Sequence, residues 1–312
     1  KDTDQKAAAR VRDFCDRQLG KGVVVCHDTP GFIANRLGVY WLTAGINEAI
    51  KQNVSVEIAD AVMSKPVGIP KTGVFGLLDL IGIDLIPKLA TSLLSTLPKG
   101  DAYRALHIDH PFIHEMIKAG YTGRKGKGGF YRLNPDPAAK KEKQSLKLSA
   151  AAFAESMYAK SDKVSLASVD AGKQGLRAVV ETNDACGKYA WAVLSQTLHY
   201  AASLVPEIAD TIADVDEAMR LGYNWKKGPF EMMDDLGSAW LAEQWKKQGL
   251  TVPPLVAKLG AGTFYKVEGG KLHFFGTDGK YHPVARAEGV LLLSDIKLGS
   301  KPLIKTGSAS VW

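Results

Sequence analysis

The sequence carries one pattern twice, and this internal repeat limits the possible fold more than any other feature. GVFGLLDLIG at residues 73–82 resembles GPFEMMDDLG at 228–237, with glycine, phenylalanine and aspartate at matching places. Upstream of these segments VEIADAV resembles ADVDEAM, and downstream GFY at 129–131 resembles TFY at 263–265. Three matches in the same order indicate a tandem duplication, so the chain should build one kind of unit twice.

Apolar residues at helical spacing predict that both copies are mainly α. In the first copy, Thr29 is placed to cap a helix and Pro30 to occupy its first turn. The helix that follows, through Ile50, is apolar on most sides and should be central and buried. Helical patterns punctuated by glycine and proline continue over residues 50–132 and return over 150–265.

The first 28 residues follow a different pattern. Val11, Phe14 and Leu19 recur at helical spacing, and Gly20 follows where a helix would end. The β-branched run at 23–26 predicts a short strand that is covered on both faces. Since one helix and one such strand do not make a sheet, we interpret residues 1–28 as the last αβ unit of an open α/β domain.

Composition shifts divide the rest of the chain. The stretch 134–149 is charged and contains proline, which is typical of a linker or an exposed arm. The tail from Leu272 is rich in turns with short β-like runs. The predicted divisions are 1–28, 29–133 for the first helical domain, 134–149 for the linker, 150–283 for the second helical domain, and 284–312 for a connector.

Charge, cysteine spacing and hydropathy exclude several classes of protein. The net charge is +7, but the basic residues are scattered, which is typical of a solvated surface rather than of a nucleic-acid interface. Cys15, Cys26 and Cys186 have no zinc-site spacing, which favours a reduced cytosol. The most apolar stretch, 77–97, is interrupted by two aspartates, a proline and a lysine, so no membrane span is expected.

The repeat also separates scaffold residues from candidate functional ones. Asp79 and Asp234 occupy the same place in both copies, which favours a structural hydrogen bond over acid–base chemistry. Asn35 has no counterpart in the second copy, and its amide needs a partner, either backbone or ligand. Its neighbour Arg36 is interpreted as an ion-pair or capping residue.

The loop GRKGKGG at 123–129 is a second candidate, because its backbone and its cations could face a phosphate. In the second copy Leu259 replaces Lys125, so an anionic ligand would bind at the first copy only. A flexible basic turn is the equally weighted alternative.

His107, His110 and His114 are close enough in sequence to suggest a metal site. Pro111 breaks the helical register that would align them, and the pattern of known zinc motifs is missing. We therefore expect no metal there. The sequence also has no nucleophile elbow, P-loop or complete dinucleotide fingerprint in a strand-to-helix context.

Longer segments resemble a known family. VVVCHDTPGFIANRLGVYWLTAGINEAI, GVFGLLDLIGID and GYTGRKGKGGFYRL resemble, in this order, signature segments of the carboxy-terminal domain of L-3-hydroxyacyl-CoA dehydrogenases. DVDEAMRLGYNWKKGPFEMMDDLG resembles the second such domain of bifunctional fatty-acid oxidation enzymes. The resemblance implies two tandem helical bundles of the 6-phosphogluconate-dehydrogenase C-terminal-like type, preceded by a remnant of a Rossmann domain.

The same resemblance implies a reaction, a cofactor and partners. The reaction is hydride transfer from C3 of a 3-hydroxyacyl-CoA to NAD in fatty-acid β-oxidation, in the cytoplasm. Asn35 matches an asparagine that positions the substrate, and Lys125 matches a lysine that reaches NAD. The family's nucleotide fingerprint and catalytic histidine are not in this sequence, so the chain is expected to be an inactive fragment alone.

The implied partners are the NAD-binding domain of the same polypeptide, a crotonase-like domain after LLLSDIKLGSKPLIKTGSASVW, and a thiolase. Two other functions stay open at this point. One is a non-enzymatic helical interaction module, and the other is a two-domain dehydrogenase that acts on sugar acids.

Overall fold

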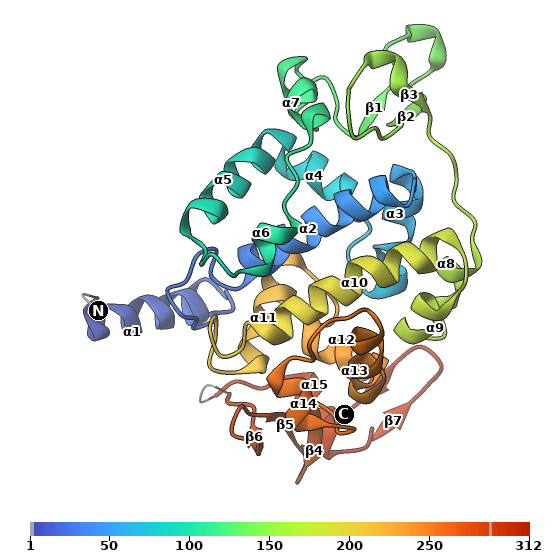
Figure 1. The fold of residues 1–312 in the computed structure, drawn as a ribbon. Coiled ribbons are helices and arrows are strands. Elements are labelled where there is room, and N and C mark those ends of the chain that lie inside the picture. Colours follow the sequence, from blue (N-terminus) through green and yellow to red (C-terminus); the bar gives the residue numbers. More distant parts are fainter. Residues whose placement is uncertain (1–2, 287–288) are drawn as a thin grey trace.

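The computed structural model describes residues 3–286 and 289–312, and most of its ordered elements are helices (Figure 1). The elements up to residue 160 are α1 Gln5–Asp13, the π-turn η1 Phe14–Gln18, α2 Ala34–Lys51, α3 Val56–Val62, η2 Lys65–Val67, α4 Phe75–Ile81, η3 Ile83–Leu85, α5 Ile86–Thr96, α6 Ala102–Leu106, α7 Pro111–Lys118, β1 Tyr131–Leu133, η4 Pro137–Ala139, β2 Lys143–Leu146, η5 Glu155–Met157 and β3 Tyr158–Lys160. The later elements are α8 Ala167–Ala171, α9 Leu176–Glu181, α10 Ala185–Ser203, α11 Ile212–Tyr223, α12 Pro229–Leu236, α13 Ser238–Lys247, α14 Pro254–Leu259, β4 Tyr265–Glu268, β5 Lys271–Phe275, β6 Tyr281–Pro283, α15 Leu293–Gly299, β7 Ile304–Lys305 and β8 Ser310–Val311. Below, the first half means residues 29–160 and the second half means residues 167–283.

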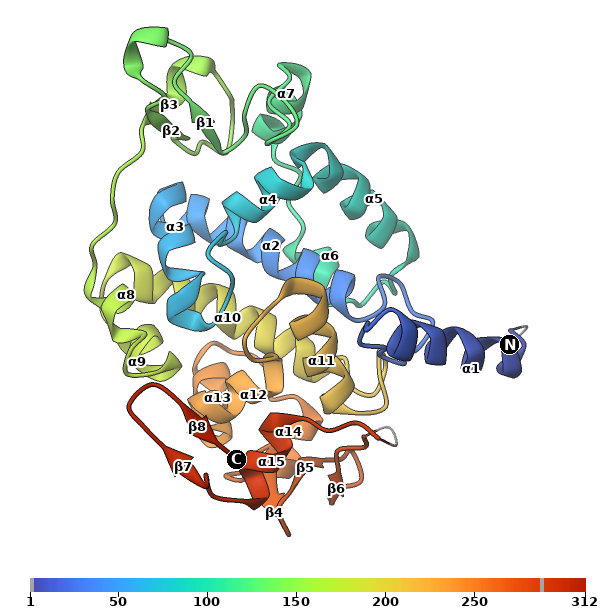
Figure 2. The ribbon, with the colours of Figure 1, turned by 180° about the vertical axis from the view of Figure 1, so that it is seen from behind.

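Two long helices, α2 and α10, form the centre of the molecule and pack against each other (Figures 1 and 2). The rings of Tyr40 and Tyr200 stack at 4.0 Å between centroids, and the Tyr189 hydroxyl donates to the Gly45 carbonyl at 2.9 Å. Helix α2 also contacts α11, and α10 in turn contacts α3. This reciprocal arrangement is that of a two-fold interface between equivalent units.

The predicted central helix exists, but it begins later than the sequence indicates. Residues 30–33 form a turn, and α2 starts at Ala34. The prediction that Thr29 caps this helix is wrong, because its buried hydroxyl has no hydrogen-bond partner in the described residues. The physical reason is that Gly31 and Phe32 both have positive φ, 78° and 51°, which turns the chain before it can become helical.

Asp79 and Asp234 play the same structural role in the two halves, as predicted. Asp79 accepts from the N–H groups of Phe130 and Tyr131 at 2.7 and 2.8 Å. Asp234 accepts from the two corresponding backbone groups, those of residues 264 and 265, at 2.6 and 2.9 Å. Burial raises the pKa of each carboxyl to about 6. Asp79 therefore links α4 to the start of β1, and Asp234 links α12 to the start of β4.

A second pair of aspartates, Asp60 and Asp216, was not singled out from the sequence. Asp60 accepts from Phe75 and Gly76 at the start of α4, with distances of 2.8 and 2.9 Å. Asp216 accepts from two N–H groups at the start of α12 in the same way. The N-cap residues of these two helices, Val74 and Gly228, have no side chain that caps the helix, so the aspartate of the preceding helix supplies an acceptor for the first turn.

Substituting either tying aspartate is expected to destabilise the fold. Asp79→Ala and Asp234→Ala should each lower the free energy of unfolding by about 2–4 kcal/mol, because two backbone N–H groups lose their acceptor. Urea denaturation followed by circular dichroism measures this, with exposed Asp162→Ala as the matched control. A loss below about 1 kcal/mol in both variants would contradict the structural role.

The amino-terminal segment agrees with the prediction only in part. Helix α1 forms and η1 continues it, so the amphipathic helix is confirmed. The predicted strand at 23–26 is wrong, since residues 20–27 have no regular structure. A β-strand needs a neighbour to take its backbone hydrogen bonds, and no other described strand lies beside this segment. Val11, Phe14 and Val25 are consequently more than half exposed.

The stretch 134–149 is more ordered than a linker. It contains β2, which pairs antiparallel with both β1 and β3, so β3 belongs to the sheet of the first half. This sheet lies at one end of the molecule, and the extended segment 161–166 leads from it to α8 (Figure 1). The predicted boundary at 149/150 is therefore wrong, because cross-strand pairing with distant residues decides it.

The tail from Leu272 contains most of β5 and all of β6, as its β-like runs predicted, and these strands form a sheet with β4, which precedes the tail. The helix α15 that follows was not predicted. Residues 287–288 of the predicted connector lie outside the described residues. None of the helices in the described ranges combines the length and the apolar character that a bilayer-crossing helix requires.

Candidate functional site

Asn35 lies in the first turn of α2, and its side chain is exposed. No hydrogen bond joins its amide to another residue in the described part of the chain. Of the two partners that the sequence left open, backbone or ligand, the backbone is therefore not used. The amide is available to a ligand approaching the amino-terminal end of α2.

The neighbouring Arg36 is completely buried and holds this end of the helix in place. Its guanidinium donates to the Tyr200 hydroxyl at 2.5 Å, to the Pro30 carbonyl at 3.3 Å and to Glu207 at 3.2 Å, and it forms a close ion pair with Asp101. The prediction that Arg36 is an ion-pair residue is confirmed. Because Tyr200 and Glu207 belong to the second half, Arg36 also joins the two halves.

The turn before α2 supports the same geometry. A Cβ at Gly31 would lie 3.0 Å from the Arg36 backbone nitrogen and 3.3 Å from the Leu93 side chain, so only glycine fits this turn without a shift. Phe32, which follows, is 54% exposed. Phe32 and Asn35, both exposed, therefore follow a turn in which Gly31 is tightly packed.

Lys125 lies in the loop between α7 and β1, and its side chain is about half exposed. Its ammonium group pairs with Asp84 at 2.7 Å, and the hydrogen bond from Lys125 holds the pKa of Asp84 below its usual range. Asp84 follows α4, and its counterpart in the second half is Ala239. The second half therefore lacks both members of this pair.

The backbone of the loop 123–129 is largely occupied by its own turn. Gly123 donates to Gly128, Gly126 donates to Gly123, and Lys127 donates to Gly120, each at 2.8–3.0 Å. The expectation that loop amides face a phosphate is therefore wrong for these groups. Any anion would be met by the side-chain cations instead.

The other two cations of the loop face a different space, which the sequence did not predict. Arg124 and Lys127 line a broad open crevice together with Lys71 and Lys143, whereas Lys125 is not among its lining residues. Acidic side chains, including Asp162, line the same crevice. Lys143 comes from β2, so this grouping depends on strand pairing and has no local signal in the sequence.

The structure does not bring Asn35 and Lys125 together. Asn35 lies at the start of α2, near α1, whereas Lys125 pairs with a residue of η3, between α4 and α5 (Figure 1). Within the described residues the two side chains therefore form two separate contact points rather than one site.

The closely spaced histidines have separate partners. His110 shares a hydrogen bond with Asn47 at 2.8 Å, and His114 shares one with Asp109 at 2.6 Å. In residues 3–286 and 289–312, no three histidine, cysteine or acidic side chains are grouped as a metal site would require.

Comparisons with known proteins agree with this architecture. A family model described as the C-terminal domain of 3-hydroxyacyl-CoA dehydrogenase matches residues 31–133 and again 187–254, together more than half of the chain. A fatty acid oxidation complex trifunctional enzyme of Rickettsia felis is 36% identical over 259 residues, which is 83% of this chain and 34% of that protein. A 3-hydroxyacyl-CoA dehydrogenase of Bacillus subtilis is 31% identical over 320 residues, covering 100% of this chain and 39% of the relative.

The chain thus spans roughly a third of the length of these curated relatives. Among solved structures, 3-hydroxybutyryl-CoA dehydrogenase from Escherichia coli is similar in fold, with a TM-score of 0.50 and 20% sequence identity, over 79% of this chain and 62% of that one. On the strength of the two matched segments, the chain belongs to the 3-hydroxyacyl-CoA dehydrogenase C-terminal domain family.

Proposed function

We propose that this chain is the substrate-side portion of an NAD-dependent L-3-hydroxyacyl-CoA dehydrogenase, which oxidises 3-hydroxyacyl-CoA to 3-ketoacyl-CoA in fatty-acid β-oxidation. The observation that carries the proposal is the exposed amide of Asn35, presented by a helix end that the buried Arg36 anchors. Family membership supports the same reaction class.

In this proposal Asn35 positions the substrate and does not move a proton. Its amide hydrogen-bonds the oxygen of the reacting acyl portion and holds C3 in the orientation required for transfer. NAD, when bound, supplies the hydride acceptor. A rigid support is essential to such a role, because a misplacement of about 1 Å can cost about a hundredfold in rate.

The residues of the loop 123–129 suit an anionic cofactor through charge rather than through backbone amides. The ammonium group of Lys125 is about half exposed and pairs with Asp84. A cofactor phosphate would share or replace that carboxylate as the partner of Lys125. We therefore assign Lys125 to a contact with NAD. Asp84 positions the ammonium group of Lys125 for that contact.

The nucleotide fingerprint and the catalytic histidine of the family are not found in the 312 residues. In the proposal both are supplied by an NAD-binding domain of the same polypeptide. A crotonase-like domain and a thiolase are the further proposed partners, in keeping with the trifunctional name of the Rickettsia relative.

The test of this proposal joins the chain to an NAD-binding domain. The chain is fused behind a family NAD-binding domain that contains the fingerprint and the histidine, and NADH formation is followed with a 3-hydroxyacyl-CoA. We expect turnover from the fusion and none from either part alone. A well-folded fusion that binds NAD but forms no NADH would favour the non-enzymatic interaction module.

Lys125→Ala in the active fusion is expected to weaken NAD affinity about tenfold, the effect of losing one charge-assisted hydrogen bond. The loss should shrink as ionic strength rises, because salt screens an exposed charge. Isothermal titration with NAD at low and high salt measures both effects. Lys88→Ala is the matched control, since Lys88 lies 3.7 Å from the same Asp84 but is more exposed; equal NAD affinities for Lys125→Ala and the parent would remove Lys125 from the site.

A further inference from the structure

The broad crevice of the first half is lined by several cationic side chains. Its walls come from α3, α4, the loop 123–129, β1 and β2, all in the upper half of Figure 1. We call it the basic crevice after the six cations that line it: Lys65, Lys71, Arg124, Lys127, Arg132 and Lys143. Within residues 3–286 and 289–312, none of the six forms an ion pair with a carboxylate, whereas Lys125 of the same loop pairs with Asp84 at 2.7 Å. The basic crevice therefore presents positive charge to the solvent.

The acidic side chains of the basic crevice are mostly occupied by hydrogen bonds. Asp60 and Asp79 each accept from two backbone N–H groups, and burial raises the pKa values of their carboxyls to about 7 and about 6. Glu57 accepts from the N–H of Asp162 at 3.3 Å and forms a close hydrogen bond with Ser145. Asp162 is the exposed one of the four. The six cations exceed these four acidic groups in number even when all four are ionised.

The second half provides acidic partners at the corresponding place. Asp60 and Asp216 accept from equivalent N–H groups, so the two halves can be matched from these residues. Three lining residues of the basic crevice then have charged counterparts: Arg220 for Ser64, Glu217 for Ala61 and Glu231 for Gly76. Arg220 forms close ion pairs with both glutamates. The second half thus neutralises its own cation, whereas the first half has alanine and glycine where those carboxylates would be.

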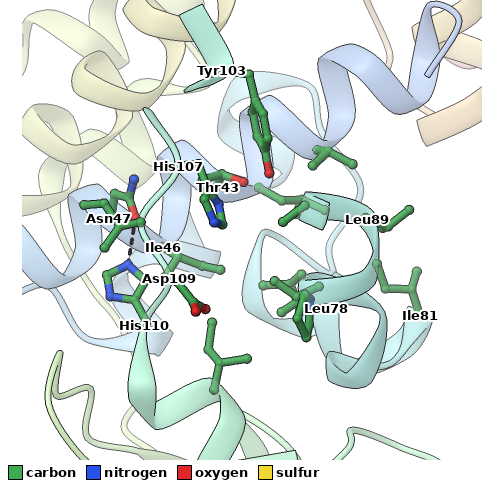
Figure 3. Close-up of a pocket in the computed structure, with 17 residues that line it drawn as sticks. Thr43, Ile46, Asn47, Leu78, Ile81, Leu89, Tyr103, His107, Asp109 and His110 are labelled. Carbon is green, nitrogen blue, oxygen red and sulfur yellow. Dashed lines mark hydrogen bonds between the residues drawn. The ribbon is translucent and has the colours of Figure 1, made fainter. Parts of the chain in front are cut away.

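Helix α4 contributes to the basic crevice and, on another face, to a much smaller apolar hollow. Leu78 and Ile81 line the hollow across from Ile46 of α2 (Figure 3), and water has access to about 40 Å³ there. Gly76 and Asp79 line the basic crevice, where the accessible volume is about 1000 Å³. Since small-molecule sites have volumes of roughly 300–1,000 Å³, the basic crevice is large enough for a ligand with several charged groups.

Aromatic rings hold two of the cations in place. The Arg132 guanidinium lies 3.8 Å from the centre of the Tyr158 ring and donates to the Tyr121 hydroxyl at 2.9 Å. The Lys143 ammonium lies 3.7 Å from the centre of the Tyr131 ring. A cation over an aromatic ring is attracted to it but keeps its charge. These contacts therefore fix two positive charges of the basic crevice without neutralising them.

We propose that the basic crevice binds a small molecule that carries a diphosphate group, such as a nucleoside diphosphate, at a site separate from Lys125. Its cations come from different parts of the chain, with Lys71 before α4, two cations in the loop 123–129 and Lys143 on β2. Two linked phosphate groups can therefore meet more of these cations than a single phosphate can. Arginine and lysine side chains bind phosphate oxygens through charge-assisted hydrogen bonds. This site goes beyond the proposed function, which uses Lys125.

Isothermal titration of the 312-residue chain with inorganic pyrophosphate and with ADP tests the proposal. We expect each to bind at least about tenfold more tightly than orthophosphate and AMP, because the second phosphate group meets a further cation. The affinity for pyrophosphate should fall as ionic strength rises, since salt screens exposed charges.

Gly76→Glu is the informative variant, because it introduces the carboxylate that the second half has at this position. Gly76 is helical, and a Cβ there would lie 3.4 Å from the Asp60 carboxylate and 3.8 Å from the Thr72 side chain, which are ordinary contacts. We expect Gly76→Glu to weaken pyrophosphate binding at least about tenfold, because its carboxylate competes for the same cations. Gly76→Gln is the matched control, since it adds a side chain of the same size without the charge, and it should change the Kd less than about threefold.

Lys127→Gln tests the cations themselves and should weaken pyrophosphate binding about fivefold. Lys99→Gln is its control, because Lys99 is also exposed but does not line the basic crevice. Circular dichroism melting shows whether each variant folds, and Lys127→Gln carries the test if Gly76→Glu does not fold.

The outcomes separate this proposal from the proposed function. Pyrophosphate binding that Gly76→Glu and Lys127→Gln weaken and that Gly76→Gln and Lys99→Gln retain supports the site. No saturable binding below about 1 mM, or the same Kd in the parent, Gly76→Glu and Lys127→Gln, overturns it. Equal affinities for orthophosphate and pyrophosphate overturn the diphosphate class. Binding that Lys125→Ala removes and Lys127→Gln retains overturns the separate site. NADH formation by the fusion enzyme is measured independently, so the proposed function stands if the fusion turns over while pyrophosphate does not bind.

Discussion

Arg36→Ala is expected to lower the free energy of unfolding by about 3–5 kcal/mol, because it leaves a buried carboxylate without its counterion. The side chain of Asp101 is only 4% exposed, and Arg36 is its close ion-pair partner. The Tyr200 hydroxyl, which lies between them, would keep its bond to Asp101 at 2.9 Å but lose the guanidinium. A neutral hydroxyl cannot compensate the buried charge.

Urea denaturation measures this effect, and Arg17→Ala provides the control. Arg17 also pairs with an aspartate, Asp13, but both side chains are more than half exposed, so its loss should cost less than about 1 kcal/mol. Because Arg36 contacts residues of both halves, the two halves should lose stability together in Arg36→Ala. Similar unfolding midpoints for Arg36→Ala and Arg17→Ala would show that the contacts of Arg36 with Asp101, Tyr200 and Glu207 do not hold the halves together.

Asn35→Ala is expected to lower kcat of the fused enzyme about a hundredfold while leaving the fold intact. The reason is that the amide is exposed and packs against nothing that stability requires, yet in the proposal it orients the reacting carbon. KM should change much less than kcat, since most of the binding surface of the acyl-CoA lies elsewhere.

Steady-state kinetics with a short-chain substrate and a melting curve together test this prediction. Asn183→Ala is the matched control, because Asn183 is an exposed asparagine just before α10, the helix that pairs with α2. Unchanged kcat in Asn35→Ala would remove the residue from the site. An equal drop in kcat and melting temperature would instead indicate a structural role.

The features that the sequence predicted well depend on local pattern or on the repeat. The central helix follows from apolar residues at helical spacing, although its start at Ala34 depends on the turn at Gly31. The structural role of Asp79 and Asp234 follows from their duplication, because a residue present in both copies is a scaffold candidate. The hydrogen bonds to the following strands confirm that inference.

The features that the sequence missed depend on distant partners. The strand predicted at 23–26 lacks a neighbouring strand among the described residues. The segment 134–149 reads as a linker because its composition is polar, yet β2 is fixed by pairing with β3, beyond the end of that segment. No local pattern encodes such pairings.

Of the residues that the sequence singled out, Arg36 forms the predicted ion pair, with Asp101. The structure shows that the side chain of Asn35 is exposed, and its role in binding stays a prediction. The pairing of Lys125 with Asp84 was missed. The sequence did contain a signal for this ion pair, because Lys125 and Asp84 are both replaced in the second half, by Leu259 and Ala239.

The contact between α2 and α10 has a consequence for how this protein can change over time. In an assembly of two identical chains, one codon specifies both sides of the interface, so each mutation alters both sides at once. Here the two facing helices are encoded separately. A position can therefore change in one unit while its counterpart in the other stays as it was, and Lys125 and Leu259 show that counterparts have diverged in this chain.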